Sequence, residues 1–263
     1  MRIACWQAAC EPGTGRFLER LDAVAARAAA GGAELLVTPE MSVGGYPLSG
    51  NVLAEVAGPA DAMAGRAVRR IAREHGLAIV YGWPETDEGR LLNAVRLVDR
   101  TGNGLARYRK THLYRPAEPQ FTPGSDAVVQ ARLGELTVGL LICYDVEFPE
   151  IVRAHALAGT ELLVVPTALM APWELVARIL VPARAFESQL YVAYTNWLGV
   201  NQGVRFCGLS TVAAPDGGVS RVEEPREELL FAEIDRKVIA AARATTGYLT
   251  DRRPELYGPV TER

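Results

Sequence analysis

Short apolar segments that are typical of buried strands alternate with helical segments along this chain, and this alternation limits its fold most strongly. Strand-like segments are expected at 2–9, 34–40, 77–82, 91–98, 104–109, 134–142, 161–165, 190–196, 205–213 and 228–234. Helices are expected at 16–30, 61–75, 147–158 and 173–188. Many strands with interleaved helices form sheets that helices cover. We therefore expect an α/β protein.

The chain has no internal repeat and no low-complexity linker that would divide it. Its 263 residues, 49% of them hydrophobic, are enough to bury one substantial core. We therefore expect a single domain over residues 1–263. Its last segment, 247–263, is expected to be an irregular tail, and it contains Tyr248, Pro254, Tyr257 and Pro259.

Charge and residue usage exclude several classes of function. The net charge of −3 offers no basic surface for nucleic acid, and no apolar run reaches the length of a membrane span. Four scattered cysteines without a CxxC pair argue against a zinc site or a disulfide framework. The first residues have no signal-peptide layout. We expect a cytoplasmic protein without a metal and without nucleic-acid or membrane partners.

Cys143 is the first candidate for a reactive residue. It follows the apolar strand 134–142 and precedes the predicted helix 147–158. A residue on such a sharp strand-to-helix turn projects from the sheet into a pocket, and the helix N-terminus favours a thiolate. The backbone N–H of Tyr144 is then placed to donate to an oxyanion. The alternative is an inert buried cysteine.

A carboxylate is the more plausible base for this cysteine than a histidine. The three histidines have simpler explanations: His75 ends a helix, His112 supports a loop, and His155 lies about three turns along the helix after Cys143. Glu40 follows an apolar strand and Pro39, where partial burial raises a carboxyl pKa toward the range of a general base. A solvated loop carboxylate is the alternative for Glu40.

Lysine is rare in this chain, which makes Lys110 conspicuous. Of the 28 basic residues only Lys110 and Lys237 are lysine, and arginines flank position 110. A compact ammonium there would offset nearby negative charge and donate to an oxyanion, which a planar guanidinium does not do equally. Glu118, between two prolines on the same loop, could hold Lys110 or orient the substrate. A solvated loop would be the alternative for both residues.

The three candidates follow the ends of three different strands. In open α/β sheets, ligands bind beyond the carboxyl ends of the strands. Glu40, Lys110 and Cys143 could therefore converge in one pocket.

Four motifs carry a resemblance to a known family. LLVTPEMSVGGY, YRKTHLY, EPQFTPG and GLLICYDVEFPE occur in this order and resemble the nitrilase superfamily, or carbon-nitrogen hydrolases. The similarity runs from Met1 to about Tyr257, because MRIACWQAA, ARAFESQLYVAYTN and YLTDRRPELY also look like family segments. The resemblance implies a four-layer αββα sandwich. It also implies a homodimer or larger homo-oligomer, paired through helices and the tail.

The resemblance further implies a Glu-Lys-Cys triad. Carried over by position, the triad is Glu40, Lys110 and Cys143, with Glu118 as an auxiliary glutamate. The implied reaction is amide hydrolysis through a thioester, without a metal or organic cofactor. Alternatives at the same site are hydrolysis of N-carbamoyl amines or nitriles and thiol acyl transfer. A non-catalytic binding protein is a further alternative.

The residues after the cysteine bear on the substrate. The chain reads Cys-Tyr-Asp where nitrilases usually read Cys-Trp-Glu, and Glu147 stands where enzymes for acidic substrates often have arginine. A carboxylate there would repel an anionic substrate and attract a cationic one. CYDVEFPE and PTALMAP look most like aliphatic amidases and 5-aminopentanamidases, although Leu169 departs from the latter. We expect short aliphatic, or ω-amino, amides, with Tyr46, Trp173 and Asn196 as further pocket residues.

Overall fold

The computed structural model describes residues 1–11, 13–47, 50–60 and 62–261 and contains two sheets within these ranges. The first has the order β11-β10-β1-β2-β3-β4-β5, with β14 pairing with β1. Its strands are β1 (Arg2–Ala9), β2 (Leu35–Val37), β3 (Ala78–Asp87), β4 (Arg90–Val98), β5 (Gly104–Arg109), β10 (Trp197–Asn201), β11 (Val204–Cys207) and β14 (Glu228–Glu233).

The second sheet has the order β13-β12-β9-β8-β7-β6. Its strands are β6 (Gln130–Leu133), β7 (Leu136–Leu140), β8 (Leu162–Pro166), β9 (Tyr191–Thr195), β12 (Thr211–Ala213) and β13 (Val219–Arg221). The centre of each sheet is parallel: β1, β2 and β3 in the first, and β7, β8 and β9 in the second. Parallel strands end at the same edge, so loops that follow them gather there.

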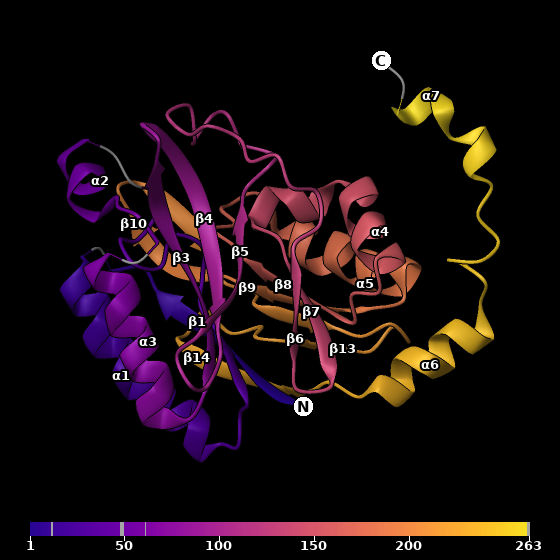
Figure 1. Ribbon diagram of the computed structural model, residues 1–263, viewed down its shortest axis with the longest axis horizontal. Coiled ribbons are helices and arrows are strands. Elements are labelled where there is room, and N and C mark those ends of the chain that lie inside the picture. Colours follow the sequence, from indigo (N-terminus) through magenta and orange to yellow (C-terminus); the bar gives the residue numbers. More distant parts are fainter. Residues whose placement is uncertain (12, 48–49, 61, 262–263) are drawn as a thin grey trace.

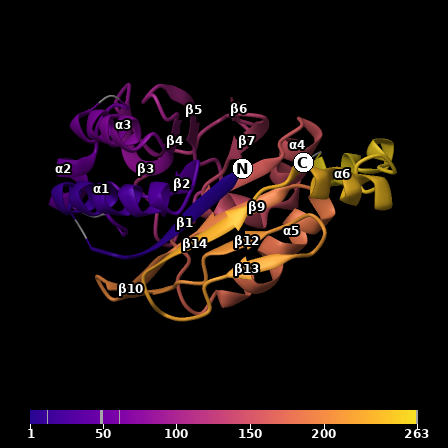
Figure 2. The same cartoon turned by 90° about the horizontal axis from the view of Figure 1, so that it is seen from below.

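Helices cover the outer face of each sheet (Figures 1 and 2). The first sheet carries α1 (Thr14–Ala30) and α3 (Met63–His75), and the second carries α4 (Pro149–Leu157) and α5 (Val181–Ser188). Three further helices are α2 (Gly50–Val56), α6 (Arg236–Thr245) and α7 (Gly258–Thr261). This arrangement is the αββα sandwich that the sequence predicts, and the fold is confirmed.

The strand β2 explains why two separate cores form. Its three residues are all buried: Leu35 and Val37 belong to the core between the sheets, and Leu36 to the core beneath α1 and α3. A strand that is buried on both faces reads as a continuous apolar run. The first sheet is therefore packed on one face against the second sheet and on the other face against α1 and α3, and this packing fixes the positions of its strand ends.

Several predicted boundaries differ from the structure. The expected strand 134–142 is shorter in the structure and consists of β7 alone, because Gly134, with a φ of 58°, lies in the turn that joins β6 to β7. The expected strand 205–213 is two strands in different sheets, and the expected helix 173–188 begins with the π-helix η2 (Val176–Leu180). Asp61, in the expected helix 61–75, lies outside the described residues.

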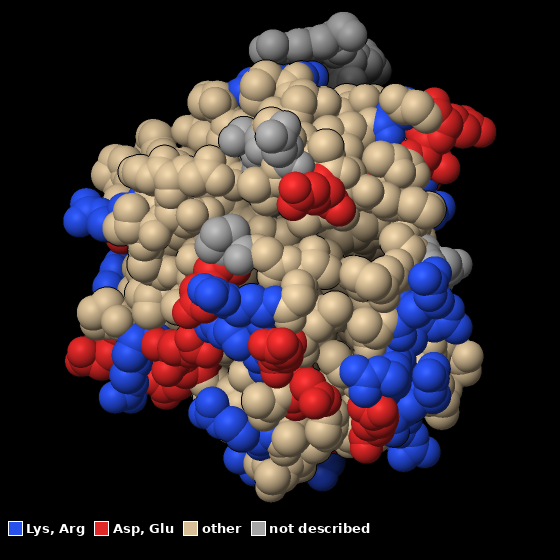
Figure 3. Space-filling model, turned by 90° about the vertical axis from the view of Figure 1, so that its left-hand side faces the viewer, with Lys and Arg blue, Asp and Glu red and all other residues tan. Residues whose placement is uncertain are grey.

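The chain after β14 extends away from the sandwich (Figure 1). The helix α6 was not expected from the sequence. The predicted irregular tail contains the short 3-10 helix η3 (Pro254–Leu256) and α7, and residues 262–263 lie outside the described part. None of the described helices is long and apolar enough to cross a bilayer. On the face in Figure 3, charges of both signs are interspersed among the described residues.

Candidate active site

Three strands deliver the predicted reactive residues to one end of the sandwich. Glu40 lies three residues after β2, Lys110 directly after β5, and Cys143 three residues after β7. The first two strands belong to one sheet and the third to the other. The site therefore lies where the two sheets face each other, as the positions of the strand ends predicted.

The two glutamates and the lysine form a buried ionic cluster. Nζ of Lys110 donates to Oε1 of Glu40 at 2.8 Å and to Oε2 of Glu118 at 2.7 Å. The side chains are at most 1% exposed. Burial excludes the solvated-loop alternative for all three, because an unpaired charge could not be held there.

Backbone contacts hold these side chains in place. The carbonyl of Glu40 accepts from Nε1 of Trp197 at 2.8 Å, and its N–H donates to the carbonyl of Thr167. The N–H of Tyr114 donates to Oε2 of Glu118 at 2.9 Å. Two sheets and one loop thus fix the positions of the two carboxylates.

Asn93 on β4 is a member of this cluster that the sequence reasoning missed. Its Nδ2 donates to Oε1 of Glu40 and to Oε1 of Glu118, each at 2.7 Å. It is fully buried. The available signal was a polar residue in the middle of the apolar segment 91–98, since a buried polar side chain needs partners.

The cluster shifts the pKa of Glu40 and that of Lys110. Burial, with a contribution from the charge of Glu118, raises the pKa of Glu40 despite the opposing effect of Lys110. Burial alone would lower the pKa of Lys110, but the charges of Glu40 and Glu118 raise it well above its usual value. Lys110 is therefore a permanent cation, and Glu40 is a carboxylate with raised basicity.

Cys143 begins a sharp turn after β7. Its φ is 48°, which is uncommon for a residue with a side chain, and the 3-10 helix η1 (Cys143–Glu147) starts at it. The first N–H groups of a helix have no partner inside the helix. The N–H of Tyr144 is one of these first N–H groups, and its donation to an oxyanion stays a prediction.

The protonation of Cys143 differs from the expectation that the helix N-terminus would favour a thiolate. Burial, followed by the charge of Glu40, raises the pKa of the Cys143 thiol. The cause is that the short η1 and Lys110 do not offset the loss of hydration and the nearby carboxylate. The raised pKa favours the thiol form, and a thiol would need a base before it could attack a substrate.

Asp145 joins the turn to the lysine loop and was also not singled out from the sequence. Its Oδ2 accepts from the hydroxyl of Tyr108 at 2.9 Å and from the N–H of Ile142 at 3.2 Å. Its Oδ1 accepts from Thr111 and from the backbone and ring nitrogens of His112. His112 therefore supports this loop, as expected.

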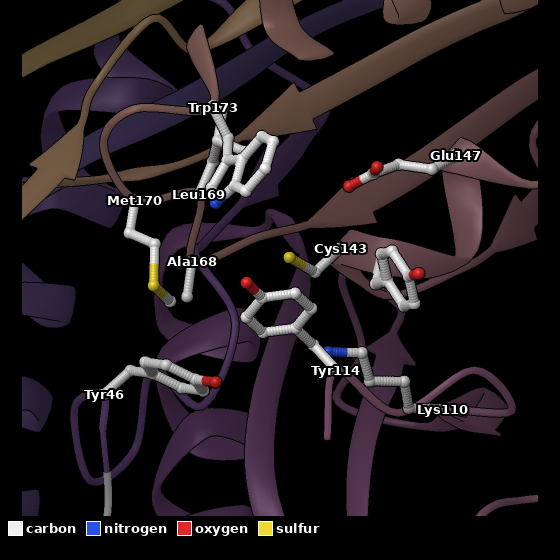
Figure 4. A pocket seen from close by; sticks show the side chains of 10 residues that line it. Tyr46, Lys110, Tyr114, Cys143, Glu147, Ala168, Leu169, Met170 and Trp173 are labelled. Carbon is white, nitrogen blue, oxygen red and sulfur yellow. The ribbon is translucent and has the colours of Figure 1, made fainter. Parts of the chain in front are cut away.

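The cavity beside Cys143 is small and mainly apolar. It has a volume of about 240 Å³. Figure 4 shows Cys143 at its centre and Lys110 at one side. The wall consists of Tyr46, Lys110, Tyr114, Cys143, Tyr144, Glu147, Ala168, Leu169, Met170 and Trp173. Tyr46, Glu147 and Trp173, three of the four expected pocket residues, thus line the cavity.

The fourth, Asn196, lies behind the wall. It is fully buried and bonds to the backbone of Leu169 through both its Oδ1 and its Nδ2. It also donates to the carbonyl of Gly208 at 2.7 Å. These bonds consume its amide, so Asn196 shapes the lining segment 168–170 instead of contacting a ligand in this cavity.

Glu147 is the second charged group of the cavity and is half-buried. Within the described ranges its carboxylate has neither an ion pair nor a hydrogen bond. Burial raises its pKa, opposed by the charges of Lys110 and Arg184. An unpaired carboxylate in an apolar cavity favours a ligand that brings a donor or a positive charge. No cluster of three potential metal ligands occurs among the described residues.

Known proteins share the whole of this architecture. The carbon-nitrogen hydrolase family matches residues 2–244. A Pseudomonas protegens protein, "Hydrolase in pqqF 5'region", is 42% identical over all of this chain and 93% of its own length. An (R)-stereoselective amidase from a Pseudomonas species is 38% identical over 89% of this chain and 84% of its own.

A solved structure is similar over nearly the same extent. It is a cysteine-to-alanine mutant of the amidase from Nesterenkonia sp. AN1 in complex with butyramide. It is 36% identical, has a TM-score of 0.87, and covers 98% of this chain and 96% of that one. The chain described here belongs to the carbon-nitrogen hydrolase family. It is an enzyme of the amidase type in the nitrilase superfamily. The expected family and the expected class of enzyme are both confirmed.

Proposed function

We propose that this chain hydrolyses short aliphatic carboxamides to carboxylic acids and ammonia, with Cys143 as nucleophile and Glu40 as general base. The observation that carries the proposal is a thiol beside a buried Lys110–Glu40 pair in a small apolar cavity. A thiol with a raised pKa needs a base, and a carboxylate with a raised pKa can act as one. No histidine lines the cavity within the described ranges.

In the first half of the reaction, Glu40 takes the thiol proton and the sulfur attacks the amide carbonyl. Lys110 and the N–H of Tyr144 stabilise the oxyanion of the tetrahedral intermediate. When the carbon–nitrogen bond breaks, protonated Glu40 gives its proton to the leaving nitrogen. Ammonia departs and a thioester on Cys143 remains.

In the second half, Glu40 takes a proton from water, and the resulting hydroxide attacks the thioester. The same donors stabilise the second oxyanion. Its collapse breaks the carbon–sulfur bond, and Glu40 returns the proton to the sulfur. The carboxylic acid leaves and the thiol is restored. Glu118 holds Lys110 by accepting from its ammonium group, and Asn93 holds Glu40 by donating to its carboxylate.

The cavity supports the choice of short aliphatic acyl groups. Its volume of about 240 Å³ suits a few carbon atoms, and Ala168, Leu169 and Met170 form an apolar wall. The related Nesterenkonia amidase mutant binds butyramide, which has four carbons. Cytoplasmic location and assembly into a homo-oligomer remain predictions from the sequence.

The carboxylate of Glu147 narrows the proposed class of substrates. We propose a preference for amides that carry a positive charge at the far end of the acyl chain. An ammonium group would supply the counter-charge that this half-buried carboxylate lacks. The pKa of Glu147 is raised by burial, so its negative charge develops at a higher pH than that of an ordinary glutamate. The preference for a cationic amide should therefore strengthen as the pH rises through this pKa.

The test compares kcat/KM for 5-aminopentanamide and for pentanamide by ammonia release. We expect the cationic amide to be favoured by about tenfold, equivalent to about 1.4 kcal/mol at the transition state. The variant Glu147→Gln should reduce this ratio to about one, because it removes the charge and keeps the shape. Glu150→Gln, which changes an exposed carboxylate outside this cavity, is the matched control.

Either part of the proposal can fail separately. If wild-type protein prefers pentanamide, Glu147 is a structural charge and the enzyme is a general aliphatic amidase. If neither amide is hydrolysed but pentanenitrile or an N-carbamoyl amine is, the reaction assignment is wrong while the nucleophile stands. An active Cys143→Ala variant would falsify the mechanism itself.

A further inference from the structure

Asn93 contacts all three charged residues of the buried cluster, Glu40, Glu118 and Lys110. One amide nitrogen donates to both carboxylates of the site, at 2.7 Å each. The carbonyl of the same residue accepts from the N–H of Lys110 at 2.8 Å. A single residue of β4 therefore contacts the two glutamates by its side chain and the lysine by its backbone.

The chemistry of an amide sets its orientation here. Carboxylates only accept, so the NH₂ group must face Glu40 and Glu118, while the amide oxygen would be repelled. The consequence is that Oδ1 of Asn93 has no hydrogen-bond partner in the described part of the chain, although it is buried. An unsatisfied buried acceptor is costly, and such exceptions concentrate where function requires them.

The two oxygens of Glu40 are made unequal by these contacts. Oε1 accepts from Lys110 at 2.8 Å and from Asn93 at 2.7 Å. No described group donates to Oε2, which is also buried. A proton on Oε1 would have to displace two short hydrogen bonds, one of them from a cation. A proton on Oε2 displaces nothing.

We infer that Asn93 is a positioning residue that occupies Oε1 of Glu40 and so makes Oε2 the atom that exchanges protons with Cys143 and water. The inference rests on the proposed function, in which Glu40 is the base. Asn93 donates to Glu118 at the same distance of 2.7 Å, and both carboxylates also accept from Lys110.

The Asn93 donor also affects the pH dependence of the reaction. Hydrogen bonds from Lys110 and Asn93 favour the ionised form of Glu40, against burial and the charge of Glu118. Loss of the Asn93 donor should therefore raise the pKa of Glu40 further, and the acid limb of kcat/KM should move to higher pH. The titratable groups that act on or feel Glu40 are Lys110, Glu118, Cys143, Tyr46 and Tyr194.

The experiment compares Asn93→Ala, Asn93→Ser and Val95→Ala with wild type. Val95 is a buried residue two positions further along β4, so its truncation loosens the same strand without removing a donor to the cluster. The pH profile of kcat/KM is measured with butyramide, whose lack of charge avoids a contribution from Glu147. The rate of Cys143 alkylation by iodoacetamide, followed by peptide mass spectrometry, is measured over the same pH range.

We expect Asn93→Ala to shift the acid limb of both profiles upward by about one pH unit, and Val95→Ala to leave both in place. Asn93→Ser, which keeps one hydroxyl donor, should shift them less, and it carries the test if the alanine variant does not fold. Unshifted profiles, or equal shifts in Val95→Ala, would overturn the inference. A shifted alkylation profile in a protein that hydrolyses no amide would uphold it and reject the proposed function.

Discussion

The reactive side chains are held in their charge states by burial and by one another. Lys110 keeps its charge because two carboxylates outweigh its desolvation, and Glu40 becomes more basic because burial outweighs the lysine. The Cys143 thiol has a raised pKa for the same reasons. Burial thus gives Glu40 and Cys143 pKa values that neither group would have in water, as the proposed proton transfer from the thiol to the carboxylate requires.

The shape of the lysine side chain is open to a direct test. Lys110→Arg keeps the charge, but the planar guanidinium is larger than the ammonium that lies between two carboxylates and is 1% exposed. We expect kcat for butyramide hydrolysis to fall by about 100-fold or more, because an oxyanion donor is displaced. Lys237, the other lysine of the chain, is exposed, and the variant Lys237→Arg is the control. Activity within threefold of wild type would refute the role of Lys110.

At the scale of elements, two side chains, Asp145 and Arg184, hold the turn after β7 in place by hydrogen bonds. Asp145 ties η1 to the loop that carries Lys110. Arg184 on α5 donates to the carbonyls of Val146 and Glu147 at the end of η1. These contacts support the strained φ of Cys143, since a five-residue 3-10 helix has few hydrogen bonds of its own.

Because Asp145 joins η1 to the Lys110 loop by hydrogen bonds, we expect its substitution to lower both stability and activity. In Asp145→Asn the new NH₂ group faces N–H donors, so several buried hydrogen bonds are lost or reversed. We expect a loss of about 3 kcal/mol in the free energy of unfolding, measured in urea, together with a lower kcat. Asp126→Asn, on the exposed part of the same loop region, should change neither. Wild-type stability in the Asp145 variant would show that these hydrogen bonds are dispensable.

At the scale of the whole molecule, the tail is the part least attached to the sandwich. Few contacts join it to the body, among them the rings of Phe186 and Tyr248 at 5.7 Å. Apolar side chains of α5 and the tail remain exposed, namely Phe186, Tyr248, Leu256, Tyr257 and Val260. An exposed apolar surface of this kind is typical of a contact with another protein. The prediction that the tail serves oligomer contacts therefore stands on this surface and awaits a test.

Removal of residues 247–263 should reduce the assembly. The truncated chain keeps α6, which Gln189 holds through the carbonyls of Ala242 and Thr246. We expect light scattering after size exclusion, with the measured mass divided by the mass of one protomer, to give fewer protomers per assembly for the truncated chain than for the full chain. Val200→Ser, which removes an exposed apolar residue on β10, is the control. An unchanged number of protomers over a range of dilutions would reject a role for the tail in assembly.

The sequence by itself determined the alternation of strands and helices and the positions of Glu40, Lys110 and Cys143 at strand ends. Local patterns suffice for these features because burial imposes a period on each strand and helix, and because each reactive residue follows its own apolar run. The four motifs added the family. Boundaries failed where one predicted segment supplies two strands, as at β11 and β12.

Only the tertiary structure decided which polar residues join the site and in which state. Asn93 and Asp145 reach their partners across 53 and 37 positions of sequence, and no local pattern carries such pairings. Asn196 failed as a pocket residue because its amide is consumed by backbone groups of the segment behind which it lies. The charge states of Glu40, Lys110 and Cys143 likewise depend on burial and on distances between strands, which exist only once the two sheets have packed together.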